Sequence, residues 1–369
     1  MDMEVVQNEY FSSYESLEVH KLMLEDGPRT EAYKKAILSN KTVFQDAVVM
    51  DIGCGTGILS IFCAQAGAKK VYAVEASEIA NIAKEIVKEN NFDSVIEVIH
   101  KKVEDVVLPD NMKVDIIVSE WMGFYLLHEG MLDSVLIGRD KFLKENGVMF
   151  PESAVIYVAP CSVPSLHDNW SEQYGVSLST FAKHLRKSKR DKPEVMQITP
   201  KDLLTDEAAL CWIDLKEDNV SELNNYSIQH VTGAKKSGKY QGICLWFECN
   251  FPKLISGDDQ RVVLRTGPDS EPTHWKQTVI LLPEEQEIEE GEPIAFQLDM
   301  SRDQTNPRRY NLALTLLDPD TADHSVPCNC YMTKCILIRT LLSEQNGETL
   351  NQKKTSDVSQ EILEDDVID

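Results

Sequence analysis

Acidic residues lie at the ends of two apolar runs that the sequence predicts to be strands. Asp51 is near the end of the run 47–52, and Glu75 follows the run 70–74. The first run leads straight into a glycine-rich loop, which consists of Gly53, Cys54, Gly55, Thr56 and Gly57. Glycine lets the backbone approach a ligand closely and adopt left-handed conformations. The pattern therefore predicts a ligand site where both strands end.

The chemistry of this loop narrows the choice of ligand. The loop has no lysine, and the G-K-[ST] pattern of a phosphate-binding loop is absent. A dinucleotide is possible, but its anionic pyrophosphate gains nothing from Asp51 beside it. Glu75 is spaced to accept hydrogen bonds from both hydroxyls of a ribose. A cationic adenosine compound without phosphates fits better, and S-adenosylmethionine is that compound. A glycine turn with a purely structural role is the alternative.

Two further carboxylates, Glu120 and Glu129, bracket an apolar and aromatic segment after the predicted strand 114–119. Two carboxylates that face each other in an apolar pocket are costly unless a cation lies between them. A guanidinium fits, because its planar fork donates hydrogen bonds to carboxylates in pairs. The same spacing also fits two unrelated surface glutamates, since the chain has 61 acidic residues.

The elements that position these residues change in character near Pro151. Before it, predicted strands alternate with predicted helices, a pattern that favours a mostly parallel sheet. The strands are expected at 47–52, 70–74, 95–99 and 114–119, and the helices at 58–66 and 77–90. Two further helices, 16–25 and 29–38, are expected on either side of the Gly27-Pro28 break.

After Pro151, short runs of period-two alternation predict an antiparallel sandwich or barrel. These runs cover 154–158, 243–251, 260–265, 276–282, 293–298 and 310–316. Residues 162–190 interrupt them with a polar, partly helical stretch, whose basic cluster 186–190 fits either a nuclear-import signal or a solvated helix face. Residues 284–292 include six glutamates and are expected to form an exposed loop.

Composition excludes several classes of protein. The formal net charge of −24 disfavours a nucleic-acid or anionic-membrane binder and suits basic partners. The N-terminus lacks the apolar core of a signal peptide, and no apolar run reaches the length of a membrane helix. The nine cysteines are odd in number and contain no C-x-x-C pair. We therefore expect reduced thiols, no metal site, and a soluble protein of the nucleus or cytoplasm.

With these motifs in place, the chain resembles the protein arginine N-methyltransferases, specifically the type I branch. The resemblance covers 10–341 and rests on Tyr10-Phe11-Ser12-Ser13-Tyr14, the glycine loop, the Glu120/Glu129 segment and Thr273-His274-Trp275-Lys276-Gln277. The segments 126–129 and 306–309 are most similar to the nuclear, histone-modifying subgroup.

The resemblance implies a fold and a division into domains. The fold is a Rossmann-like S-adenosylmethionine-dependent methyltransferase sheet domain, followed by a β-barrel with an inserted helical arm that makes a homodimer. The implied parts are a helical cover over the cofactor (1–40), the methyltransferase domain (41–150), the barrel (151–342), its arm (162–190) and an acidic disordered tail (343–369).

The resemblance also assigns roles to residues. Arg29 would bind the carboxylate of the methionine moiety, Asp51 and Gly53 would line that moiety, and Glu75 would bind the ribose. Val103 and Glu104 would flank the adenine, while Tyr14, His20 and Met23 would close over the cofactor. The catalytic residues would be Glu120, Glu129, and His274 paired with Asp26. The substrate-binding residues would be Tyr10, Tyr14, Met23, Glu120, Met122, Glu129, His274 and Trp275.

The implied reaction is transfer of a methyl group from the sulfur of S-adenosylmethionine to a guanidino nitrogen, which displaces the sulfur. The implied substrates are basic protein tails such as histones or arginine-glycine segments. Either Glu129 or His274 with Asp26 would take the proton. Met23 would leave room for a second methyl on the same nitrogen, which gives asymmetric dimethylarginine. Phe124 and Gly130 depart from the Tyr and Ser of many relatives. A catalytically weak scaffold or cofactor sensor, or a methyltransferase for another cationic substrate, is the alternative.

Overall fold

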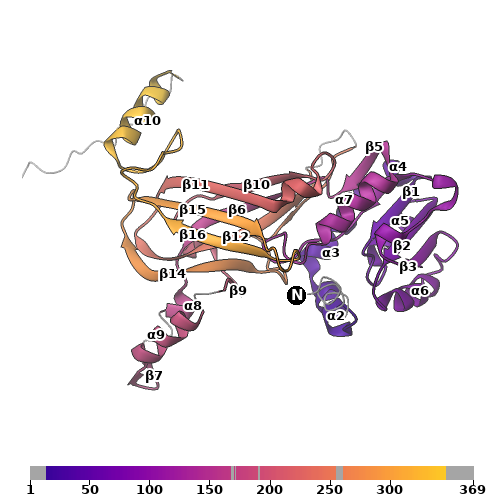
Figure 1. Ribbon diagram of the computed structural model, residues 1–369, viewed down its shortest axis with the longest axis horizontal. Coiled ribbons are helices and arrows are strands. Elements are labelled where there is room, and N and C mark those ends of the chain that lie inside the picture. The colour runs from indigo at the N-terminus through magenta and orange to yellow at the C-terminus, as the bar shows by residue number, and fades with distance from the viewer. Residues whose placement is uncertain (1–13, 168–169, 171, 190–191, 255–260, 346–369) are drawn as a thin grey trace, which may run out of the picture.

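The computed structural model describes residues 14–167, 170, 172–189, 192–254 and 261–345. Two sheet-containing bodies lie side by side along the long axis, with the helix α3 (Gly27–Ser39) between them (Figure 1). A single apolar core runs through both bodies, from Val49 in the first to Phe296 in the second. The two bodies therefore pack as one unit around the region where they meet.

The N-terminal helices break where the sequence predicts. α2 (Leu17–Glu25) ends at Asp26, whose side chain accepts a hydrogen bond from the backbone N–H of Arg29 at 3.1 Å and so caps α3. Pro28 occupies the first turn of α3, where its missing N–H costs nothing. The short helix α4 (Lys41–Phe44) then leads into the first strand.

The first body is a parallel sheet of five strands in the order β3-β2-β1-β4-β5. Its strands are β1 (Val48–Ile52), β2 (Lys70–Glu75), β3 (Ile96–His100), β4 (Val114–Val118) and β5 (Leu143–Phe150). The helices α5 (Ile58–Gln65), α6 (Ile79–Glu89) and α7 (Met131–Phe142) connect them. The strand order reverses between β1 and β4, which is where sheets of this kind bind their ligands.

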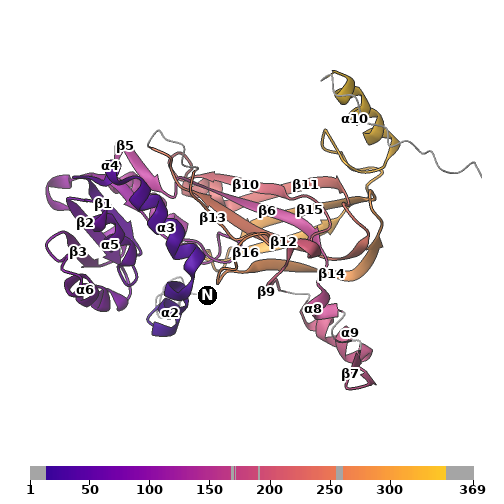
Figure 2. The same ribbon diagram turned by 180° about the vertical axis from the view of Figure 1, so that it is seen from behind.

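The second body contains two antiparallel sheets that together form a barrel (Figures 1 and 2). The larger sheet has the order β10-β6-β12-β14-β9, with β13 paired to β12. Its strands are β6 (Ser153–Cys161), β9 (Glu194–Met196), β10 (Ala208–Asp214), β12 (Gly238–Asn250), β13 (Val263–Arg265) and β14 (Gln277–Ile288). The smaller sheet contains β11 (Asn225–Gly233), β15 (Pro293–Arg302) and β16 (Tyr310–Leu316).

One expectation for the barrel is wrong. Residues 284–288 of the predicted glutamate-rich loop belong to β14, which pairs with the start of β12. Cross-strand contacts override the unfavourable composition: Gln241 donates a hydrogen bond to Glu285 at 2.8 Å, and Lys239 lies 3.6 Å from the same carboxylate. Only the turn that follows Ile288 is outside the strand.

Two segments project from the barrel (Figure 1). One is the insertion between β6 and β9, which contains α8 (Pro164–His167), the strands β7 (Glu172–Gln173) and β8 (Val176–Ser177), and α9 (Ser179–Ser188). The other ends in α10 (Thr333–Gln345), and this helix includes the first three residues of the predicted acidic tail; the rest of the tail lies outside the described residues. Among the described helices, none combines the length and apolar character required to cross a membrane.

Hydrogen bonds between buried groups fix the two bodies relative to each other. The Tyr33 hydroxyl donates to the carbonyl of Ser119 at 2.8 Å, and the Trp275 indole donates to the carbonyl of Met122 at 3.0 Å. Arg139 of α7 donates to the carbonyls of Leu215 and Asp218 at 2.9 and 2.7 Å. These bonds hold the segment after β4 between the N-terminal helices and the barrel.

Candidate active site

A cavity of about 340 Å³ lies at the carboxyl ends of β1, β2 and β4. This volume lies in the range of small-molecule sites. The N-terminal helices, the glycine loop, the segment after β4 and the turn before β14 all contribute to its wall. The predicted site residues that line it are Tyr14, His20, Met23, Arg29, Gly53, Cys54, Gly55, Thr56, Glu75, Val103, Glu104, Glu120, Met122, Glu129, His274 and Trp275.

The glycine loop takes conformations that demand glycine. Gly53, Gly55 and Gly57 have φ values of +72°, +53° and +84°. A Cβ on Gly53 would lie 2.1 Å from the Cε of Met131, so a larger residue would require the flexible Met131 side chain to move. The loop backbone therefore forms part of the cavity surface directly.

The carboxylate of Glu75 is held by three hydrogen bonds. Oε2 accepts from the backbone N–H of Gly55 at 2.9 Å, and Oε1 accepts from the backbone N–H and the hydroxyl of Ser77, both at 2.8 Å. These bonds join the end of β2 to the loop after β1. Sequence reasoning missed Ser77, although it lies only two residues beyond Glu75.

Two predicted cofactor residues do not line the cavity. Asp51 is fully buried behind the loop, where it accepts a hydrogen bond from the hydroxyl of Ser60 at 2.6 Å. Burial, with a smaller contribution from the charge of Glu75, raises the pKa of Asp51 to about 7. Gly57 is the N-terminal cap of α5 and faces Val87 instead. Both residues shape the loop from behind.

The part of the cavity near Glu75 and Arg29 fits an adenosine sulfonium compound. Glu75 can accept from ribose hydroxyls, and the guanidinium of Arg29 can bind a carboxylate. Apolar side chains of Ile58, Val74 and Val103 provide a surface for a purine. The described part of the wall thus combines the donors, acceptors and apolar surface that such a ligand requires.

Glu120 interacts with Arg29 through an ion pair in which one carboxylate oxygen accepts from two nitrogens. The Nε and Nη2 atoms of Arg29 lie 2.7 and 2.6 Å from Oε2 of Glu120, and both side chains are 8% exposed. Burial disfavours the charge on Arg29, but the carboxylate of Glu120 outweighs burial and raises the pKa of the guanidinium. The carboxylate of Glu120 thus already binds one guanidinium through charge-assisted hydrogen bonds.

Glu129 also lines the cavity but has a different environment. Burial, together with the charge of Glu120, raises the pKa of Glu129, whereas a hydrogen bond donated by the hydroxyl of Tyr14 partly offsets the rise. Its backbone N–H donates to the carbonyl of Arg308 at 2.7 Å, and Arg308 donates back to the carbonyl of Glu129 at 2.7 Å. Arg308 also lines the cavity, although the segment 306–309 was noted only for its similarity to one subgroup of the family.

The conformation of the segment after β4 positions these carboxylates. Glu129 and Gly130 have φ values of +79° and +61°, so the chain turns sharply before α7 begins. Phe124, one of the two departures from many relatives, lines the cavity. A Cβ on Gly130 would lie 3.2 Å from the Cα of Arg308, so this glycine allows a close approach of the barrel.

His274 and Asp26 form the predicted pair. Nδ1 of His274 and Oδ2 of Asp26 are 2.6 Å apart, and the same oxygen accepts from the backbone N–H of His274 at 2.9 Å. Burial tends to raise the pKa of Asp26, but the hydrogen bonds from His274 prevail and lower it. The ring of Trp275 packs against His274 with centroids 4.1 Å apart. The pair thereby connects the barrel to α3.

The remaining predicted residues cover the cavity from α2. Nε2 of His20 lies 2.8 Å from the carbonyl oxygen of Tyr14, and the carbonyl of Met23 accepts from Nη1 of Arg29 at 3.1 Å. Tyr10 lies outside the described residues. The wall also includes Lys101, Lys102, Met131 and Ser134, which sequence reasoning did not single out.

Comparisons with known proteins agree with this architecture. Residues 152–317 match the family described as the arginine methyltransferase oligomerization subdomain, and residues 35–128 match the ribosomal protein L11 methyltransferase family. A probable protein arginine N-methyltransferase 6.1 of Oryza sativa subsp. japonica is 38% identical over 330 residues, which cover 83% of this chain and 84% of the relative. Human protein arginine N-methyltransferase 2 is 38% identical over 313 residues, which cover 83% and 72% of the two chains.

Solved structures give the same result. The Trypanosoma brucei PRMT1 enzyme-prozyme heterotetrameric complex with AdoHcy superposes with a TM-score of 0.72 at 34% identity, covering 85% of this chain and 98% of that one. Arabidopsis thaliana protein arginine methyltransferase 10 also gives a TM-score of 0.72 at 34% identity, with coverage of 83% and 94%. The chain belongs to the protein arginine N-methyltransferase family. The resemblance seen in the sequence and the predicted fold class are thereby confirmed.

Proposed function

We propose that this protein is a type I arginine methyltransferase that makes monomethyl and asymmetric dimethyl arginine on basic protein segments. The observation that carries the proposal is a single cavity that joins the glycine loop and Glu75 to the paired carboxylates of Glu120 and Glu129. S-adenosylmethionine supplies, when bound, a methyl group on a positively charged sulfur, and a nitrogen that attacks this methyl group would release the sulfur as a neutral thioether.

The chain first positions the two reactants. Glu75 would hold the ribose, Arg29 the methionine carboxylate, and the apolar wall at Val103 the adenine. His20 and Met23 of the helical cover would exclude water from the reactive centre. Orientation alone contributes much of the acceleration in such reactions, since effective molarities of about 10⁵ M or more are reached in well-aligned pairs.

The two glutamates would then prepare the nucleophile. A guanidinium is protonated at neutral pH and shares its charge among three nitrogens. Carboxylates at Glu120 and Glu129 would draw positive charge to the nitrogens that they contact, which leaves lone-pair character on the remaining nitrogen. Glu129 is our choice of proton acceptor, because its raised pKa and direct access to the cavity suit a general base. The pair formed by His274 and Asp26 would hold Trp275 in position relative to α3.

Two features support the proposed product and the proposed class of substrate. Met23 lines the same cavity as the two glutamates, and its flexible side chain would leave room for a second methyl on the same nitrogen. The net charge of −24 favours basic protein substrates. We also propose a homodimer held by the arm at 162–190, because the matched family model describes an oligomerization subdomain and a structural relative is a heterotetramer.

Mass spectrometry of an arginine-containing histone-tail peptide, incubated with the protein and S-adenosylmethionine, tests the proposal. We expect asymmetric dimethylarginine, which fragment ions distinguish from the symmetric isomer. The Glu129→Gln variant should bind S-adenosylhomocysteine normally but lose turnover by about 10² to 10⁴, the usual contribution of a general base. Symmetric product would contradict the type I assignment. Absence of product from a panel of basic proteins, despite cofactor binding, would favour a scaffold.

A further inference from the structure

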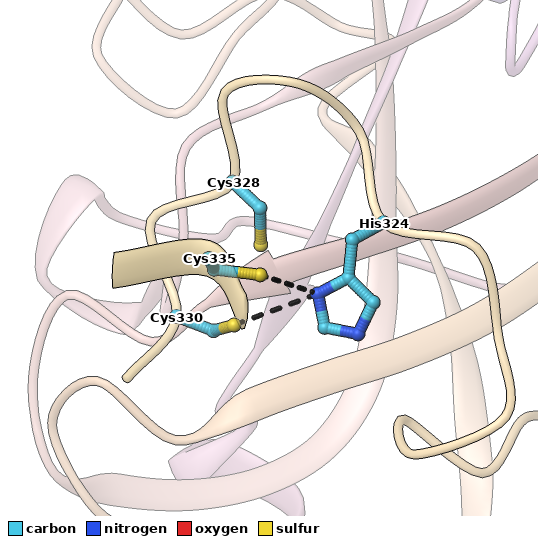
Figure 3. A group of neighbouring side chains, drawn as sticks. All are labelled: His324, Cys328, Cys330 and Cys335. Carbon is cyan, nitrogen blue, oxygen red and sulfur yellow. Dashed lines mark hydrogen bonds between the residues drawn. The ribbon is translucent and has the colours of Figure 1, made fainter. Parts of the chain in front are cut away.

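A cluster of metal-binding side chains lies far from the active site, at the end of the barrel where the chain leads into α10. His324, Cys328, Cys330 and Cys335 converge there, and their ligand atoms all lie within 4.8 Å of one another (Figure 3). Nδ1 of His324 is 3.1 Å from the sulfur of Cys335 and 3.5 Å from that of Cys330. The three cysteines are at most 3% exposed.

The donor set matches zinc. Structural zinc sites are tetrahedral and use three thiolates with one imidazole as a common combination. With zinc–sulfur bonds of about 2.3 Å, neighbouring sulfurs in a tetrahedral site lie roughly 3.8 Å apart. The four ligand atoms can therefore reach one ion with side-chain adjustments of less than an ångström or so.

The histidine is oriented for this purpose. Nε2 of His324 lies 2.8 Å from the carbonyl oxygen of Pro319, so Nε2 carries the proton and Nδ1 presents its lone pair to the sulfurs. Imidazole ligands of metals almost always donate their other N–H to a carbonyl or carboxylate. A histidine that served only to fill space would not need this arrangement.

The backbone around the cysteines is also held in place. Arg339 of α10 donates through Nη1 to the carbonyls of Cys328 and Cys330. On the barrel side, the backbone N–H of Tyr331 donates to the carbonyl of Gly291 at 2.8 Å. A Cβ on Gly233 would lie 2.7 Å from the backbone of Asn329 and Cys330, so the segment packs directly on β11.

Apart from these hydrogen bonds and the packing of Leu317 and Ala322 against the barrel, the segment has little apolar core of its own. Residues 317–345, which are described throughout, contain no strand. Their separate apolar cluster consists of the three cysteines with Met332 packed against them. Four residues of α10 are partly or largely exposed: Ile336, Leu337, Ile338 and Leu341. A structural metal would add a cross-link that this small cluster does not supply.

We propose that His324, Cys328, Cys330 and Cys335 bind one zinc ion, which anchors α10 to the barrel. This departs from the expectation of no metal site, which rested on the missing C-x-x-C pair. The ligands instead follow the spacing H-x₃-C-x-C-x₄-C, with Cys335 in the first turn of α10. The main rival is a disulfide between two of the thiols, which the same proximity allows.

Metal analysis of the full chain, purified under reducing conditions without chelator, tests the proposal. We expect one zinc per chain by inductively coupled plasma mass spectrometry. Replacement by Co²⁺ should give the visible absorption of a tetrahedral cobalt–thiolate site. The Cys330→Ser variant should lose the metal, and His324→Cys should keep it, because four thiolates also bind zinc tetrahedrally. Cys211→Ser, a buried cysteine of β10, is the matched control and should keep one zinc.

A second readout uses the wild-type chain and does not depend on whether a variant folds. Chelation should raise hydrogen exchange in residues 317–345 while exchange in the glycine loop stays unchanged. The proposal is overturned if the wild-type chain contains no zinc and acquires no cobalt spectrum on titration with Co²⁺. It is equally overturned if peptide mapping without reduction finds a disulfide among Cys328, Cys330 and Cys335. None of these measurements requires methyltransferase activity.

Discussion

At the scale of single residues, the hydrogen bond from Tyr14 limits how far the pKa of Glu129, the proposed general base, is raised. Burial raises the pKa of Glu129 above its ordinary value, and the Tyr14 hydroxyl partly offsets this. Activity that requires the carboxylate is therefore present above this pKa and lost as the pH falls through it. The loss should begin at a higher pH than for an exposed glutamate.

The Tyr14→Phe variant isolates this contribution. Removal of the donor should raise the pKa of Glu129 further, so the acid limb of the kcat/KM profile should move to higher pH. The measurement is kcat/KM for a basic peptide as a function of pH, and Glu129→Gln should abolish the limb. A limb that stays in place in Tyr14→Phe would assign the titration to another group.

The sequence identified much of this site because the chemistry required particular residue types. Glu75 and Glu120 stand out as acids next to predicted strand ends, Glu129 stands out as the second acid of the segment that follows, and all three line the cavity. Arg308 was not predicted to line it, because its contact with Glu129 spans 179 residues of sequence. Local pattern carries no information about such a contact.

At the scale of elements, the variant Gly53→Ala tests whether the glycine loop requires its left-handed backbone conformation. Alanine at this position must adopt a φ near +72° and place its Cβ against Met131. The left-handed conformation alone costs about 1–2 kcal/mol. Gly53→Ala should therefore weaken S-adenosylhomocysteine binding by at least tenfold in calorimetry and lower the melting temperature.

Gly27→Ala is the matched control for this change. Gly27 begins α3, and a Cβ there would meet nothing within 4 Å. This variant should bind S-adenosylhomocysteine like the wild type. Equal affinity of both variants would show that the loop tolerates a side chain and that the glycine is not required for binding.

The elements of the parallel sheet could be predicted because each buried strand is a continuous apolar run. β5 was missed, since its first half, Leu143-Lys144-Glu145-Asn146, is polar and mostly exposed. β10 and β11 were missed as well, because each mixes exposed and half-buried positions along its length. Strand order and the pairing of β12 with the glutamate-rich end of β14 depend on long-range contacts and could not be derived from local alternation.

At the scale of the whole molecule, the acidic surface predicts a dependence on salt. Charges that steer a basic substrate are screened at high ionic strength. The apparent KM for a basic peptide should therefore rise with added salt by more than the apparent KM for S-adenosylmethionine. Steady-state kinetics at two or more salt concentrations measure both values. A parallel response of the two would contradict steering.

The arm makes a second prediction at this scale. Tyr174 is fully exposed, and Phe181 is 49% exposed although it packs against Trp170. If the arm holds a homodimer, the double change Tyr174→Ser and Phe181→Ser should shift the chain from dimer to monomer in light scattering coupled to gel filtration. Trp212→Ser removes a 57% exposed aromatic residue from β10 and should leave the dimer intact. A monomeric wild type would refute the arm interface.

The ion pair between Arg29 and Glu120 has a consequence for how the two reactants meet. Arg29 is the proposed contact for the methyl donor, and Glu120 is the proposed contact for the methyl acceptor. These two side chains form an ion pair with each other. An anionic group that takes hydrogen bonds from Arg29 leaves more of the charge of Glu120 for a cationic partner. We therefore expect that a ligand bound at Arg29 raises the affinity of the cavity for a cation at Glu120. Thermodynamic reciprocity requires that the enhancement be the same factor whichever reactant arrives first.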